Sequence, residues 1–274
     1  MRRFLLAFGL TLLVSLPGYA ASVDGIAINS ATTGSGPTLI FVHGWTCDSS
    51  SWAAQVPEFA KRYRVITLDL PGHGKSGLPK DGQFSIDLFA KAVEAVRAEA
   101  GADKVVLIGH SMGAPVIRQY AHNYSTHVAG LVAVDGPLDM RAFGPVQPGQ
   151  GPPQMKGAEG LKAREGMIRG MFVATTPEPL QKHILDMMLG APEATANGAM
   201  AAMFDPSIRW SDPLRMPSFL VAAGTASAPN AAASKDVLPA FEATQLAGTG
   251  HFLMMEKPEE FNLLLTGFLD KIHF

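Results

Sequence analysis

The chain has 274 residues, of which 47% are hydrophobic and 17% are charged, and its formal net charge at pH 7 is −2. Such a length and composition are typical of one large α/β domain with a sizeable core. Because the charge is nearly balanced and no long run of lysine or arginine occurs, nothing favours binding to nucleic acid.

The first 20 residues predict a secretory signal peptide. Arg2 and Arg3 form a charged start, the run 4–16 is apolar, and small residues end the segment at Ala20. The apolar run is too short for a comfortable membrane span. We therefore expect cleavage after Ala20, a secreted or periplasmic mature protein, and no stable membrane span; the alternative is an uncleaved anchor.

Short apolar runs alternate with helical patterns along most of the remaining chain. The expected strands are 26–30, 38–42, 64–70, 105–108, 130–134, 218–222 and 242–246. The expected helices are 48–60, 87–100, 112–120 and 258–272. This alternation predicts an α/β fold with a mostly parallel sheet and helices on both faces.

Residues 137–213 interrupt the alternation. A loop rich in Pro, Gly and Gln comes first at 144–154, and helical patterns follow at 156–172, 180–189 and 193–204. Because the segment stands between two strands, we interpret it as a helical cap inserted between two core parts, 21–136 and 214–274. Nine of the thirteen methionines lie from Met140 to Met216, where flexible thioethers suit either a pocket wall or packing of the cap onto the sheet.

The segment Gly109-His110-Ser111-Met112-Gly113 fits the G-x-S-x-G pattern of a nucleophile elbow. An expected strand precedes it and an expected helix follows it, which is the context that this motif requires. Small neighbours permit the tight turn that lifts the Ser111 hydroxyl out of the sheet and aims a helix N-terminus at it. Ser111 is therefore the candidate nucleophile.

Three further loops follow expected strands: His43-Gly44-Trp45, the segment 69–76, and Gly248-Thr249-Gly250-His251-Phe252. With the elbow, they make the chain resemble the α/β-hydrolase superfamily, serine hydrolases with an esterase-like or lipase-like site, from about Gly25 to Phe274 apart from the cap. The resemblance implies the α/β-hydrolase fold and the chain order serine, acid, histidine, with His251 as the histidine. It also implies an oxyanion hole made by the backbone N–H groups of Trp45 and Met112.

Serine, acid and histidine form the catalytic triad of this superfamily, and the position of the acid differs here from that in many relatives. Many α/β-hydrolases place an aspartate after the strand that follows the cap, but Ser227 occupies that position here. Asp135 ends the strand before the cap, which is the alternative position in the superfamily, and we predict that Asp135 is the acid. The fallback carboxylates are Asp205, Asp212 and Asp236.

The expected chemistry follows from these residue types. His251 would accept the Ser111 proton and return it to the leaving group, while the carboxylate fixes the imidazole tautomer. The predicted pocket residues are His43, Met167, Met171 and Met187. The sequence predicts no metal site and no cofactor, because Cys47 is the only cysteine and the histidine pair His122 and His127 has no nearby partner ligands.

The leading functional hypothesis is an exported carboxylesterase that acts on small or medium apolar esters through an acyl-enzyme. The alternatives are a lactonase, an amidase or peptidase, a carbon–carbon hydrolase, a perhydrolase, or a ligand-binding relative without turnover, which Ser227 alone supports. Haloalkane dehalogenase and epoxide hydrolase chemistry is disfavoured, because related enzymes of those classes have an aspartate where Ser111 stands. The expected partner is a small-molecule, ester-type substrate.

Overall fold

The computed structural model describes residues 21–80, 82–139, 154–205, 208–226 and 231–274. The signal peptide expected at 1–20, Ser227, and residues 144–153 of the loop expected at the start of the cap lie outside these ranges.

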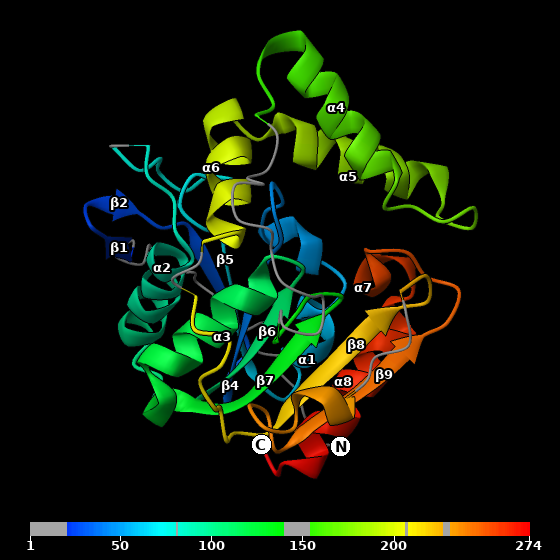
Figure 1. The fold of residues 1–274 in the computed structure, drawn as a ribbon. Coiled ribbons are helices and arrows are strands. Elements are labelled where there is room, and N and C mark those ends of the chain that lie inside the picture. Colours follow the sequence, from blue (N-terminus) through cyan, green and yellow to red (C-terminus); the bar gives the residue numbers. More distant parts are fainter. Residues whose placement is uncertain (1–20, 81, 140–153, 206–207, 227–230) are drawn as a thin grey trace, which may run out of the picture.

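Within the described ranges, a seven-stranded sheet has the order β3-β5-β4-β6-β7-β8-β9 (Figure 1). The strands are β3 (Ser30–Thr33), β4 (Thr38–Val42), β5 (Arg64–Leu68), β6 (Val105–His110), β7 (Val128–Val134), β8 (Ser218–Ala223) and β9 (Phe241–Leu246). Every neighbouring pair is parallel except β3 with β5. The mostly parallel sheet expected from the sequence is confirmed.

The strand expected at 26–30 is instead divided into two pieces. Residues Ile26–Ala27 form β2, which pairs with β1 (Ser22–Val23) in a separate two-stranded sheet, and Ser30 begins β3. Between them, Ile28 N–H donates to Ala21 O, and Asn29 O accepts from Asp69 N–H. The backbone groups of Ile28 and Asn29 are therefore satisfied outside a continuous strand.

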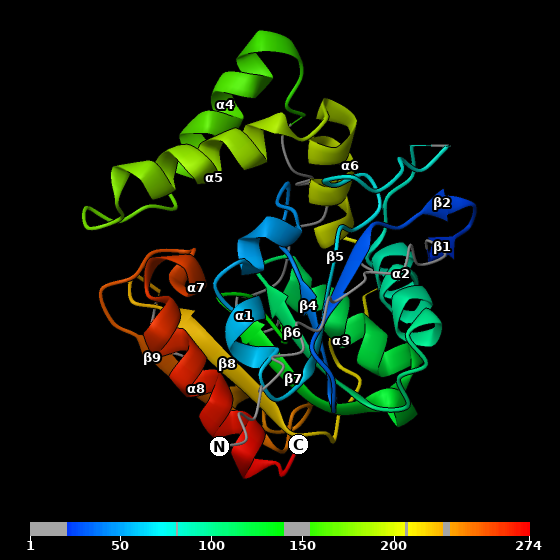
Figure 2. The same ribbon diagram turned by 180° about the vertical axis from the view of Figure 1, so that it is seen from behind.

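Helices cover both faces of the sheet. In the core they are α1 (Val56–Phe59), α2 (Ile86–Glu99), α3 (Gly113–Asn123), α7 (Leu253–Glu256) and α8 (Pro258–Lys271). Figures 1 and 2 show α2 and α3 against one face, and α1 and α8 against the other. The helix expected at 48–60 is broken into a 3₁₀ helix, η1 (Ser49–Trp52), and α1, because Pro57 has no N–H to donate to the preceding turn.

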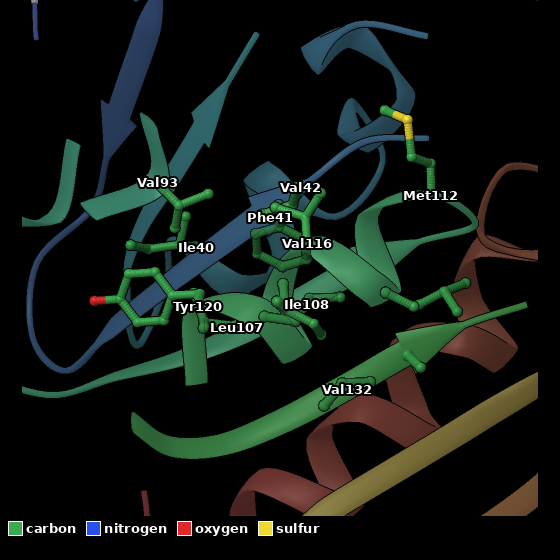
Figure 3. Packing of buried hydrophobic residues seen from close by; sticks show 14 of the residues in the cluster. Ile40, Phe41, Val42, Val93, Leu107, Ile108, Met112, Val116, Tyr120 and Val132 are labelled. Carbon is green, nitrogen blue, oxygen red and sulfur yellow. The ribbon is translucent and has the colours of Figure 1, made fainter. Parts of the chain in front are cut away.

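The central strands are buried on both sides, which explains their continuous apolar sequence. All five residues of β4 and all six of β6 are buried. Figure 3 shows part of this core, with Ile40, Phe41, Leu107, Ile108, Val116 and Tyr120 among the labelled side chains. The edge strand β9 is less buried and carries polar residues such as Glu242 and Gln245.

The segment interpreted as a cap forms α4 (Gly157–Arg169), α5 (Glu178–Gly190) and α6 (Glu193–Met203), which lie beyond the carboxyl ends of the strands (Figure 1). Two hydrogen bonds join α6 to core loops: the Thr195 hydroxyl donates to Gly72 O at 2.7 Å, and Trp45 Nε1–H donates to Ala196 O at 2.8 Å. The cap helices are therefore connected to the core loops at the carboxyl edge of the sheet.

Arg118 of α3 connects the two chain segments that flank the cap. Its buried guanidinium donates to the carbonyl of Leu138, which precedes the cap. It also donates to the carbonyls of Arg209, Trp210 and Asp212, which follow the cap helices. One side chain thus satisfies four backbone acceptors at the place where the chain leaves the core and returns to it.

Three fully buried histidines lie near the carboxyl edge of the sheet: His43, His73 and His110. Burial lowers the pKa of each, to about 3 for His73 and His110. The neutral imidazoles of His43 and His73 form hydrogen bonds to backbone groups. His43 Nε2 accepts from Leu70 N–H, and His73 Nδ1–H donates to Pro71 O. These imidazoles are therefore neutral parts of the fold at neutral pH.

The protein should lose stability as the pH falls below about 6.5. The pKa of His73 is about 3 when folded against 6.5 when unfolded, so the unfolded chain takes up protons first. The stabilisation is complete above pH 6.5 and declines toward pH 3. Thermal midpoints measured between pH 7 and pH 4 should therefore fall, and His73→Gln should flatten the decline. The exposed His183→Gln is the control, and an unchanged pH slope in His73→Gln would contradict this account.

Candidate active site

Ser111 lies in the turn between β6 and α3 with a φ of 52°. This left-handed backbone conformation is uncommon for residues other than glycine. Two backbone hydrogen bonds of 2.9 Å hold it, because Ser111 N–H donates to Val134 O and Ser111 O accepts from Ala114 N–H. The serine is thus presented at the carboxyl edge of the sheet by a strained turn.

The glycines of the elbow are required by close contact between backbones. A Cβ atom on Gly109 would lie 2.4 Å from Gly113 O, and one on Gly113 would lie 2.4 Å from Val42 O. Both distances are shorter than any tolerable carbon–oxygen contact. Residues larger than glycine at these two positions would therefore push α3 away from β4 and β6.

His251 lies in the loop between β9 and α7, and its imidazole contacts Asp135 at the end of β7. The distance from His251 Nδ1 to Asp135 Oδ2 is 2.5 Å, and the other carboxylate oxygen accepts from Ala223 N–H at 2.8 Å. Burial raises the pKa of Asp135, but the hydrogen bond from His251 and the donor at Ala223 outweigh it, so this pKa lies below its ordinary value. The carboxylate is therefore ionised beside Nδ1.

Two of the fallback carboxylates, Asp212 and Asp236, lie elsewhere. Asp212 lies 3.4 Å from both His122 and Arg209, and Asp236 is on an exposed loop. In the described part of the chain, Asp135 is the carboxylate that His251 contacts. The structure thus brings together the acid and the histidine that the sequence analysis paired.

The loop 43–45 lies directly against the serine. A Cβ atom on Gly44 would lie 3.1 Å from Ser111 Cβ. Across the described ranges, the backbone N–H groups of Trp45 and Met112 donate to no protein acceptor, and Met112 is the N-cap of α3. Two N–H groups beside a nucleophile, one of them at a helix N-terminus, can stabilise an anionic oxygen.

Asp69 holds three chain segments together through its carboxylate. Its buried carboxylate accepts from the backbone N–H groups of Ser49 and Lys75 at 2.8 and 2.9 Å, and from the Asn29 amide at 2.8 Å. Gly74 is required beside it, since a Cβ there would lie 2.4 Å from Asp69 Oδ2. The turn-rich segment 69–76 is therefore a structural support rather than a source of catalytic groups.

His110, which precedes Ser111 in the chain, forms a hydrogen bond to the backbone of His251. Its Nε2–H donates to His251 O at 2.9 Å, and the two ring centroids are 4.7 Å apart. Burial and the nearby His251 lower the pKa of His110 to about 3. His110 is therefore neutral at neutral pH, and its Nε2–H is used to hold the backbone of His251.

A cavity of about 80 Å³ adjoins Ser111 and His251. Its other lining residues are Trp45, Cys47 and His110 from the first core segment, Met171, Met188, Met200 and Met203 from residues 154–205, and Phe252. Burial raises the pKa of the Cys47 thiol to about 12, so this side chain is a neutral apolar surface. The cavity is small and lined largely by thioethers and aromatic rings.

Of the four predicted pocket residues, Met171 lines this cavity, and the other three do not. Met167 is 39% exposed on α4, and the Met187 sulfur lies 3.6 Å from the hydroxyls of Ser50 and Ser51. His43 lies outside the lining, because its two ring nitrogens bond to backbone groups.

Successive residues of a helix point about 100° apart, so Met188 faces the cavity while Met187 does not. The sequence does not say which face of α5 packs inward. The enrichment of methionine in the cap is the signal that could have indicated Met188, Met200 and Met203 as a group.

The described ranges contain no cluster of three or more His, Cys, Asp or Glu side chains that could hold a metal ion. In the same part of the chain, none of the helices is both long and apolar enough to cross a membrane.

Known proteins share this framework. Among curated relatives, the chain is 31% identical to epoxide hydrolase 3 of Mus musculus over 129 residues, which are 47% of this chain and 35% of that protein. It is 36% identical over 101 residues to a pimeloyl-[acyl-carrier protein] methyl ester esterase of Aeromonas hydrophila, with 37% and 38% of the two chains covered. The chain thus matches about a third of the length of these relatives.

Solved structures match over nearly the whole chain. A thermophilic esterase from Thermogutta terrifontis has a TM-score of 0.80 at 25% identity and covers 93% of this chain and 97% of its own. The esterase EaEST from Exiguobacterium antarcticum has a TM-score of 0.80 at 21% identity, with 93% and 100% covered, which shows a shared fold. Residues 37–193, more than half of the chain, match the family model described as alpha/beta hydrolase fold. With its sheet, elbow and cavity, this chain is a member of the α/β-hydrolase family.

Proposed function

We propose that the protein is an exported serine hydrolase that cleaves small carboxylic esters through an acyl-enzyme on Ser111. The observation that carries the proposal is the 2.5 Å contact between His251 Nδ1 and Asp135 Oδ2, next to a cavity that Ser111 and His251 both line. A serine, an ionised carboxylate and a histidine in this chain order are the parts of a catalytic triad.

Each group has a role in the proposed reaction. Asp135 keeps the proton of His251 on Nδ1, which leaves Nε2 as the base for the Ser111 hydroxyl. When Ser111 Oγ attacks the ester carbonyl, the N–H groups of Trp45 and Met112 stabilise the oxyanion. His251 then donates its proton to the departing alcohol, and afterwards activates the water that releases the acid.

The substrate class follows from the walls of the cavity. Apart from the catalytic groups, it is lined by Met, Trp, Phe, a neutral Cys and the neutral His110, which suits an apolar acyl group of limited size. The similarity to a methyl ester esterase over 101 residues and to the fold of the Thermogutta terrifontis esterase supports ester cleavage.

Ser111→Ala should lower kcat for p-nitrophenyl acetate by at least about 10⁴-fold, because no other group can form the acyl-enzyme. A fluorophosphonate probe should label Ser111 stoichiometrically in the unaltered protein. His251→Ala should be comparably damaging, and the double variant should add little, since the two residues act as a unit. Ser125→Ala, at an exposed position, is the control, and full activity of Ser111→Ala would refute the mechanism.

Asp135→Asn should lower kcat by about 10⁴-fold, as loss of the correct tautomer does in serine proteases. The fold should survive, because asparagine tolerates the φ of 43° found at this position. Asp205→Asn, Asp212→Asn and Asp236→Asn should each cost far less. Steady-state kinetics together with thermal midpoints test this. Near-normal turnover of Asp135→Asn would show that another residue supplies the carboxylate of the triad.

The mature protein should begin near Ala21 and be found outside the cytoplasm, because residues 1–20 have the charged, apolar and small-residue regions of a signal peptide. N-terminal sequencing of the exported protein tests the cleavage site. Replacing Arg2 and Arg3 by Glu should reduce export, and an intact Met1 in a cytosolic fraction would contradict the proposal.

A further inference from the structure

Two cavities meet at His251. The inner cavity of about 80 Å³ contains Ser111 and is lined mainly by thioethers and aromatic rings. The outer cavity of about 260 Å³ is more open and is lined by Asp135, Gly170, Met171, Thr225, Ala226 and His251. The residues that line both are His251 and Met171. Since His251 is needed for the chemistry, Met171 is the shared lining residue whose side chain can be replaced.

The backbone of Met171 is held independently of its side chain. Met171 O accepts from His251 N–H at 3.0 Å, and Met171 N–H donates to Ile168 O at 3.0 Å. Gly250 packs closely on the same carbonyl, since a Cβ there would lie 2.5 Å from Met171 O. Shortening the Met171 side chain therefore leaves the backbone contact to His251 in place.

The inner cavity is the place for the acyl half of an ester. In the proposed reaction the acyl group stays bonded to Ser111 until water releases it, whereas the alcohol must leave. An enclosed cavity around Ser111 suits the part that stays. Because a protein cavity of about 150 Å³ binds benzene, a cavity of about 80 Å³ accepts about three carbon atoms.

Building on the proposed function, we infer that Met171 determines the acyl-chain specificity of this protein. Its side chain closes the inner cavity toward the outer one and limits the acyl group to short chains of about two to four carbons. Without that side chain, the two cavities form one channel, and the outer cavity accepts the end of a longer acyl chain. Flexible methionine can fill such a gap without strain.

The test is a kinetic comparison of p-nitrophenyl acetate, butanoate and octanoate, with active sites counted by fluorophosphonate titration. The unaltered protein should prefer acetate and butanoate. Met171→Ala should raise the octanoate-to-acetate ratio of kcat/KM at least about tenfold, because each methylene accommodated in an apolar pocket contributes a factor of that order. Met171→Val removes part of the side chain and should shift the ratio in the same direction by less.

Two matched methionine variants show whether the effect belongs to this position. Met188→Ala enlarges the inner cavity but leaves the wall intact, so it should favour butanoate and not octanoate. Met167→Ala, on the exposed face of α4, should leave all three ratios unchanged. For acetate esters of alcohols of increasing length, the ratios of kcat/KM should be the same in Met171→Ala as in the unaltered protein. The reason is that the alcohol lies outside the inner cavity.

The outcomes separate this inference from the proposed function. If Ser111 is labelled and esters are hydrolysed, but Met171→Ala and Met171→Val change all acyl lengths equally, Met171 has only a structural role and the inference is wrong. A shift confined to the alcohol series would also overturn it. If Ser111→Ala retains full esterase activity, the proposed function itself fails.

Discussion

Close packing of backbone on backbone around Ser111 is the constraint on which the site depends. A Cβ atom on Gly113 would lie 2.4 Å from Val42 O, and one on Gly136 would lie 2.4 Å from Ser111 O. These contacts bring the carboxyl ends of β4, β6 and β7 together, with positive φ at both Ser111 and Asp135. Strained conformations persist only where the surrounding structure holds them, and here the central strands, buried throughout β4 and β6, supply that support.

The electrostatics of the site follow from burial. His110 is fully buried, and its pKa near 3 keeps it neutral beside His251. The Asp135 carboxylate is partly buried, but the donors His251 and Ala223 keep it ionised. One negative charge therefore lies beside Nδ1 of His251 without a second positive charge to compete for it. This asymmetry favours the imidazolium that the proposed reaction forms.

The cap contacts the site through its backbone and forms the pocket with its side chains. Ala196 O accepts from the Trp45 indole, and Met171 O accepts from His251 N–H. In both bonds the cap contributes a backbone carbonyl, so the bonds to Trp45 and His251 do not depend on which cap side chains line the cavity. The methionines can therefore vary the size of the pocket while the catalytic geometry is kept, which is how one fold accommodates many substrates.

The sequence alone determined the α/β class, the parallel sheet, and the loops that carry Ser111, Asp135 and His251, because strand periodicity and glycine-rich turns are local signals. It also indicated that the cap supplies methionines, but not which of them reach the cavity. That choice depends on which face of each helix packs inward, so Met188 lines the cavity while Met187 contacts Ser50 and Ser51. The division of the strand at 26–30 also depended on tertiary contacts, since Asn29 O accepts from Asp69 N–H. Only the tertiary structure places Met171 in the lining of both cavities, because those cavities are formed by residues from distant parts of the chain.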